Sequence, residues 1–203
     1  MLESISQVAT IAGVIGLGFA FLALRQSRAS FHQTVIVSCT NRFQKLSPHL
    51  KVDSPTNKFV QQYIELCNEE LFYFENEYLP QAIIDEWLEG MLYFIGLWRG
   101  KELLFLPGQP ENCPQSESEG RRFATQMHEE AKKYPRLCQA FTISADAKQR
   151  IEYAPSRYPE AKSTDDKSDV MRAQMVLEVL TNLSAYEQKP FYTYLRRMRA
   201  DAW

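Results

Sequence analysis

The sequence predicts a mostly α-helical protein in which an N-terminal transmembrane helix continues into a cytosolic helical bundle. Two observations predict this fold class. An uncharged apolar run opens the chain, and apolar residues then recur with helical spacing in several later segments. We expect three parts: a transmembrane anchor at residues 1–24, a juxtamembrane helical extension at 25–50, and a cytosolic helical domain at 51–203.

The anchor is predicted from residues 5–24, which carry no charged side chain. A helix of about 20 residues spans roughly 30 Å, which is the thickness of the hydrocarbon core of a bilayer. A cleaved signal peptide would begin with a basic region, whereas only Met-Leu-Glu-Ser precedes this run. We therefore expect a single-pass signal anchor.

The bases that follow the anchor predict its orientation. Arg25 and Arg28 come directly after the apolar run, and the only charged residue before it is Glu3. Because positive residues stay on the cytoplasmic side, we expect the N-terminus outside and residues 25–203 in the cytoplasm.

Small residues recur within the anchor at Ala12, Gly16 and Ala20. This spacing puts them on one helix face, where a second helix can approach closely. One interpretation is a self-association face that makes an oligomer. The other is the ordinary abundance of glycine and alanine in membrane helices.

The extension is predicted to be a continuous helix, because Phe31, Val35, Cys39 and Phe43 recur every four residues. Pro48 is expected to end it. Two amphipathic helices follow at residues 56–78 and 81–99. Their short joint at Pro80 predicts an antiparallel helical hairpin.

The second half of the chain is expected to hold three more helices, at residues 117–134, at 166–187, and from Pro190 to the end. Residues 138–144 and 149–154 favour either a short β-hairpin or irregular structure. The polar, proline-containing run at 154–169 is predicted to be mobile.

Charge and cysteine content argue against several function classes. The net charge is −2, so no overall field attracts nucleic acid. Residues 51–120 carry −9 and residues 121–203 carry +4, which favours attraction between segments of the fold. The four cysteines form no CxxC pair and none has a histidine at zinc-finger spacing. We therefore expect no metal and no cofactor.

Weak catalytic candidates are Arg122 and His128. Helical ribonucleases of the HEPN type use an arginine and a histidine at similar spacing, where histidine moves protons and arginine holds phosphate. The chain has three histidines among many arginines, so such a match is also expected by chance.

Two groups of arginines are candidate ligand-binding residues. One is Arg121 with Arg122, and the other is the C-terminal cluster of Arg196, Arg197 and Arg199. The C-terminal cluster alternates with aromatic residues. Three interpretations are open: a packed terminal helix with solvated arginines, contact with lipid headgroups, and binding of nucleic acid or a nucleotide.

The segment at residues 63–91 resembles a group of uncharacterised bacterial single-pass membrane proteins. In that group an N-terminal span precedes a helical domain, whose Glu-rich aromatic helix leads through a short break into a helix with Trp and an LEGM-like end. The matching residues here are Cys67, Glu69, Glu70, Pro80, Trp87, Glu89, Gly90 and Met91. The resemblance implies a bacterial inner-membrane location and a helical fold. It implies no activity.

Three functions are therefore compared. The first is a non-enzymatic scaffold that binds a protein partner or a second copy of itself. We do not expect nucleic acid to be a partner. The second is a membrane effector or sensor, with anti-phage defence as one setting, whose domain binds a small ligand such as a nucleotide. The third is a membrane-tethered ribonuclease. A pocket lined by the candidate arginines favours the second, and a domain without a pocket favours the first.

Overall fold

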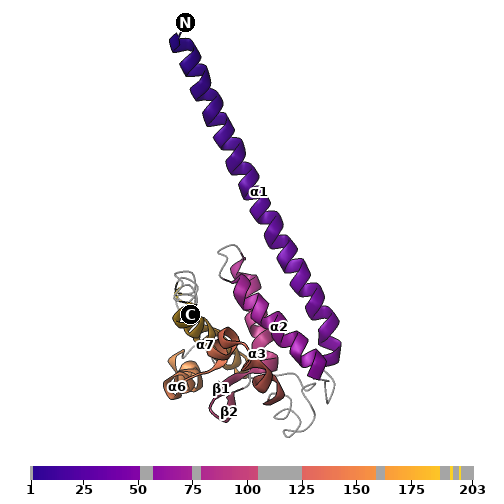
Figure 1. Cartoon of the computed structure of the whole chain (residues 1–203). Coiled ribbons are helices and arrows are strands. Elements are labelled where there is room, and N and C mark those ends of the chain that lie inside the picture. Colours follow the sequence, from indigo (N-terminus) through magenta and orange to yellow (C-terminus); the bar gives the residue numbers. More distant parts are fainter. Residues whose placement is uncertain are drawn as a thin grey trace. The chain divides into compact units, whose positions relative to one another are not determined.

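The computed structural model describes the backbone of residues 2–50, 57–74, 79–104, 125–158, 163–187, 193 and 197, and the side chains from residue 21 onward. The fold is mostly helical with one short antiparallel two-stranded hairpin (Figure 1). This confirms that the fold is mostly helical. Two compact units are present, Met1–Asn41 and Arg42–Trp203.

The described elements follow in chain order. They are α1 (Leu2–Leu50), α2 (Asn57–Tyr73), α3 (Gln81–Ile95), β1 (Leu97–Arg99), β2 (Glu102–Leu104), α5 (Pro135–Phe141), α6 (Ala145–Tyr153), the 3₁₀-helix η1 (Ala154–Arg157) and α7 (Thr164–Glu187). Residues 125–131 are also helical.

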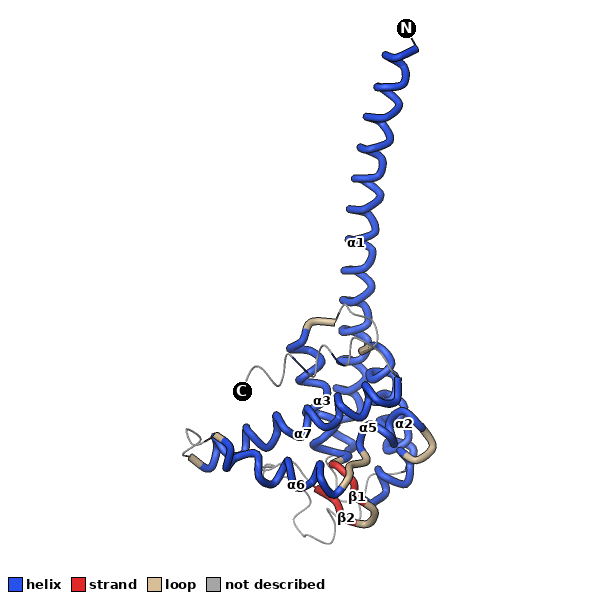
Figure 2. The backbone as a smooth tube through the Cα atoms, turned by 90° about the vertical axis from the view of Figure 1, so that its left-hand side faces the viewer, coloured by secondary structure: helices blue, strands red, loops and turns tan. Residues whose placement is uncertain are grey.

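The predicted anchor and extension form one unbroken helix, α1 (Figure 2). The prediction that Pro48 ends this helix is wrong, because α1 continues to Leu50. A proline removes one hydrogen bond to the preceding turn, and here only the last two residues of α1 lie beyond it.

The membrane-related predictions fall largely on side chains outside the described part. These include Ala12, Gly16 and Ala20. Arg25 and Arg28 are described and are exposed on α1. Among the side chains that the structure describes, no helix combines the length and the apolar character that a membrane crossing requires.

Helices α2 and α3 pack as the predicted antiparallel hairpin. Near the joint, the rings of Phe74 and Trp87 lie 6.1 Å apart. Farther from it, the Tyr63 hydroxyl donates to the Gly90 carbonyl at 3.1 Å, and the Tyr63 and Phe94 rings lie 5.2 Å apart. Residues earlier in α2 thus contact residues later in α3, as antiparallel helices require.

The predicted helix at residues 81–99 is too long, because α3 ends at Ile95. Gly96 follows with φ of 67°, and a Cβ there would lie 2.8 Å from Leu103 Cδ1. Glycine alone accepts this conformation and this approach without strain. The chain then turns into β1, whose Leu97 pairs with Leu104 of β2.

The hairpin option at residues 138–154 is wrong, since these residues form α5 and α6. Pro135 occupies the first turn of α5, a position where its missing N–H costs nothing. Ser144 caps α6 by accepting a hydrogen bond from the Ala147 amide at 3.1 Å. Both signals indicate helix starts, and they outweigh the β-branched and aromatic composition of the segment.

The prediction of a mobile run at residues 154–169 is wrong at both of its ends, where η1 and the start of α7 lie. Ser163 and Asp166 form a reciprocal cap. The Asp166 amide donates to Ser163 Oγ at 2.9 Å, and the Ser163 amide donates to Asp166 Oδ2 at 3.0 Å. This pattern fixes the start of α7.

Helix α7 supplies much of the core of the second unit. It contacts α3, α5, α6 and η1, and Figure 2 shows it running beside these elements. Its fully buried side chains are Met175, Val176, Val179, Leu180 and Leu183. Each such side chain contributes roughly 1.5–3 kcal/mol through burial. This packing fixes the position of α7, so the side chains on its other face are held in place.

Candidate functional site

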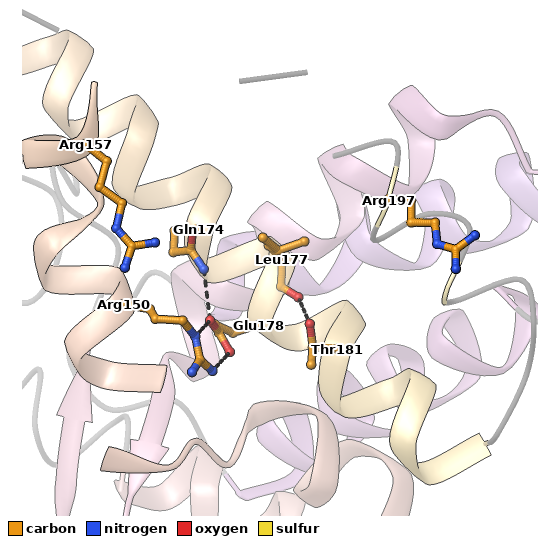
Figure 3. Close-up of a pocket in the computed structure, with 7 residues that line it drawn as sticks. All are labelled: Arg150, Arg157, Gln174, Leu177, Glu178, Thr181 and Arg197. Carbon is orange, nitrogen blue, oxygen red and sulfur yellow. Dashed lines mark hydrogen bonds and ion pairs between the residues drawn. The ribbon is translucent and has the colours of Figure 1, made fainter. Parts of the chain in front are cut away.

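A pocket of about 430 Å³ lies over one face of α7 (Figure 3). Four of its lining residues belong to α7, at positions 174, 177, 178 and 181, and this spacing places them on one helix face. The lining side chains are Arg150, Arg157, Gln174, Leu177, Glu178, Thr181 and Arg197. Three arginines from outside α7 thus surround a face of a core helix.

Glu178 is the buried acid of this pocket, with 3 % of its surface exposed. Arg150 donates from Nε to Oε1 and from Nη2 to Oε2, both at 2.8 Å. Gln174 donates from Nε2 to Oε1 at 2.9 Å. A buried carboxylate is stable only when it is paired and hydrogen-bonded in this way.

Arg150 is positioned by the packing of α6. Ala147 and Ile151 are buried on this short helix, which fixes its rotation. Arg150 lies in the last turn, where the helix dipole favours a positive charge. Hydrogen bonding to Glu178 raises the pKa of the Arg150 guanidinium, which keeps this group charged.

Arg157 and Arg197 differ from Arg150, because neither has an ion pair or hydrogen bond with another described residue. Arg157 ends η1, and this 3₁₀-helix packs on α7 through the buried Ala154. Arg197 is helical, and both arginines are exposed. Two solvated guanidinium groups therefore line the pocket with their donors available.

The charges of the lining residues leave an excess of positive charge. Three arginines and one glutamate give a formal charge of +2. Each guanidinium presents a planar fork of donors that matches carboxylate and phosphate oxygens. The arrangement can bind an anion.

The predicted ligand arginines are described only at Arg197, which lines the pocket. Arg121, Arg122, Arg196 and Arg199 lie outside the described residues.

His128, the predicted proton carrier, stacks on Trp98, with ring centroids 3.8 Å apart and an interplanar angle of 19°. The Trp98 indole N–H donates to the Ile95 carbonyl at 3.0 Å. Burial lowers the pKa of His128, which favours the neutral ring in this stack. A packing role accounts for His128. Arg122, its proposed catalytic partner, lies outside the described part of the chain.

Sequence reasoning missed most of this pocket. Arg150, Arg157, Gln174 and Glu178 were not predicted as site residues. The sequence does carry one signal for them. Glu178 is an acid within the apolar pattern of α7, next to Leu177, and Gln174 lies four residues before it. An acid on a core helix requires a buried partner, and such a partner marks a polar site.

A second polar cluster lies where α2 meets the end of α1, and it is only partly buried. Arg42 forms an ion pair with Glu69, and the neighbouring Glu70 is almost fully buried. Burial raises the pKa of Glu70 to about 8. Burial also raises the pKa of Cys67 and of Tyr63 well above their ordinary values. These groups are protonated at neutral pH and act as packing residues.

Metal ligands do not gather in the described part of the chain, where no group of three or more histidine, cysteine or acidic side chains could hold an ion. Within the described residues, Cys39, Cys67 and Cys138 are not joined in disulfides. Cys113 lies outside the described residues.

Comparison with known proteins gives no assignment. No family model matches the sequence, and neither the curated proteins nor the solved structures include a significant match to this chain.

Proposed function

We propose that this chain is a membrane-anchored effector or sensor whose helical domain binds a small anionic ligand in the pocket on α7. One observation carries the proposal: Arg157 and Arg197 line a pocket and have no partner among the described side chains. Arginines on an open surface are ordinary. Arginines from two distant segments that line one pocket with a net positive charge are typical of a site for phosphate or carboxylate.

The pocket favours this function over the scaffold. A scaffold requires only a surface, and it gives no reason to gather Arg150, Arg157 and Arg197 around one helix face. The ribonuclease requires His128 as a proton carrier, yet the stacking of His128 on Trp98 accounts for its position. Phosphorylated molecules are suitable ligands because one phosphate carries −1.5 to −2 charges at neutral pH.

The anchor is part of the proposal. Residues 5–24 would hold the protein in a bacterial inner membrane, and Arg25 and Arg28 would keep the domain in the cytoplasm. Within the second unit, Phe43 at the end of α1 packs against Tyr63 and Phe94, with ring centroids 6.2 and 6.3 Å apart. Because α1 is one continuous helix, a ligand-dependent change in the domain would be transmitted along it to the anchor.

A thermal-shift titration of the full chain in mild detergent tests the proposal. Inorganic phosphate, pyrophosphate and ATP are each added against chloride at constant ionic strength. A ligand that binds only the folded state raises the unfolding temperature as its concentration exceeds its dissociation constant. At least one of the three should stabilise the wild type, and the double variant Arg157→Gln/Arg197→Gln should lose this response.

The matched control is Arg172→Gln, which removes an arginine of α7 that pairs with Asp169 outside the pocket. It should respond as the wild type does. Equal responses in the wild type and the double variant, or no response in the wild type, would overturn the proposed site.

A further inference from the structure

Arg157 and Arg197, which have no partner among the described residues, lie at opposite ends of the pocket. Figure 3 shows Arg157 beyond Gln174 on one side and Arg197 beyond Thr181 on the other. A separate contact supports this order, since the hydroxyls of Ser184 and Thr193 lie 2.9 Å apart. Arg197 thus comes from a segment that meets α7 past Thr181.

The distance along α7 is too long for one small anion. Between Gln174 and Thr181 the helix rises about 10 Å, because each residue adds 1.5 Å. Two arginines at opposite ends of this stretch suit two separate anionic groups better than one phosphate.

The middle of the pocket carries little free charge. Glu178 neutralises Arg150 through two hydrogen bonds. Leu177 is apolar, and the Thr181 hydroxyl already donates to the Leu177 carbonyl at 2.8 Å. A neutral or weakly polar part of a ligand suits this region better than a third anionic group.

The volume agrees with a ligand of metabolite size. The pocket holds about 430 Å³, whereas one water in the liquid takes about 30 Å³. Inorganic phosphate alone would leave most of this space to water. Pockets of several hundred Å³ usually hold an organic molecule.

We infer that the ligand is an elongated small molecule with an anionic, phosphate-type group at each end, one bound by Arg157 and the other by Arg197. This inference rests on the proposed function, because it names the ligand class of the same site. The neutral middle of the ligand would lie over Leu177 and Thr181. Linking two anionic groups makes the second contact intramolecular, which strengthens binding without any new residue.

Isothermal titration calorimetry with a matched pair of probes tests the inference. Fructose 1,6-bisphosphate has a phosphate at each end of a sugar, and fructose 6-phosphate has only one. The full chain in mild detergent should bind the bisphosphate at least about tenfold more tightly. Arg157→Gln and Arg197→Gln should each remove this difference, and Arg172→Gln should keep it. Circular dichroism of each variant shows whether its fold is retained.

The outcomes separate the inference from the proposed function. If the two sugar phosphates bind with equal affinity and inorganic phosphate still stabilises the wild type, the two-anion ligand is wrong and the anion site stands. If neither the sugars nor inorganic phosphate, pyrophosphate and ATP bind, both are wrong. A bisphosphate preference that survives Arg157→Gln and Arg197→Gln also overturns the inference.

Discussion

Arg150 binds Glu178 through two parallel hydrogen bonds of 2.8 Å each, and the two partners differ greatly in exposure. The Arg150 side chain is 42 % exposed and that of Glu178 is 4 % exposed. Loss of the arginine would leave a buried carboxylate without its counter-ion. Loss of the carboxylate would leave an arginine that water can still solvate.

Arg150→Met should therefore destabilise the fold more than Glu178→Gln does. We expect about 2–3 kcal/mol for Arg150→Met, below the 3–5 kcal/mol typical of a fully buried pair because Arg150 is half-exposed. We expect about 1–2 kcal/mol for Glu178→Gln, which keeps an acceptor for Arg150. Urea unfolding of the full chain measures both. Arg157→Met is the control and should change stability by less than about 0.5 kcal/mol. A larger loss of stability in Glu178→Gln than in Arg150→Met would contradict the assignment of Glu178 as the buried partner of the pair.

Glu178→Gln should also strengthen anion binding. The substitution raises the formal charge of the lining residues from +2 to +3 and releases part of the Arg150 donor fork. We expect a several-fold tighter affinity for inorganic phosphate by calorimetry. Glu152→Gln is the matched control, because Glu152 pairs with Lys148 outside the pocket. Weaker phosphate binding in a folded Glu178→Gln variant would show that Glu178 orients Arg150 for the ligand instead of competing with it.

The stability of the domain should fall as the pH rises from about 4.5 to about 8. Burial raises the pKa of Glu70 from 4.5 to about 8, with Arg42 acting in the opposite direction and Glu69 adding to the rise. A raised pKa in the folded state means that folding takes up a proton between these values. The stabilising contribution is complete below pH 4.5 and is lost through pH 8, with a slope of about 1.4 kcal/mol per pH unit.

Glu70→Gln removes this titration. The free energy of unfolding, measured in urea at several pH values between 5 and 9, should depend less on pH in the variant than in the wild type. The variant should be the more stable protein at pH 9. The buried Cys67 and Tyr63 keep their own raised pKa values, so some loss of stability above pH 9 should persist. Identical pH profiles for the two proteins would contradict the burial of Glu70.

Gly96→Ala should destabilise the protein, whereas Gly90→Ala should not. At Gly96 the φ of 67° is unfavourable for alanine, and the new Cβ would lie 2.9 Å from the Leu104 carbonyl oxygen. We expect a loss of about 2 kcal/mol from the strain and the clash together. Gly90 lies within α3 with nothing within 4 Å of a Cβ, so alanine should be neutral or stabilising by up to about 1 kcal/mol. Thermal unfolding of both variants decides this, and equal melting temperatures would contradict the turn after α3.

The helical hairpin was predictable because its signals are local. Apolar residues repeat with helical spacing through α2, and Pro80 marks the joint before α3. The end of α3 was harder, since Trp98 continues the apolar pattern of the helix while belonging to β1. Gly96 is the residue that overrides the pattern, and its effect depends on the later contact with Leu103.

The pocket was not predictable from local pattern, because its parts are far apart in the sequence. Arg150 and Glu178 are 28 residues apart, and Arg197 comes from a further segment. The sequence shows a basic C-terminal cluster, and tertiary packing selects which arginine meets α7. The same applies to His128, whose chemistry suggested catalysis and whose contact with Trp98 indicates packing.

The most direct test of the anion site is to identify what the protein carries. The full chain, the double variant Arg157→Gln/Arg197→Gln and the control Arg172→Gln are expressed in bacteria, extracted in mild detergent and analysed by mass spectrometry for released small molecules and for bound proteins. The proposed function predicts a phosphorylated or carboxylated compound in the wild type and the control, and its loss from the double variant. A specific protein partner without any such compound, retained by the double variant, would contradict the proposal and favour the scaffold.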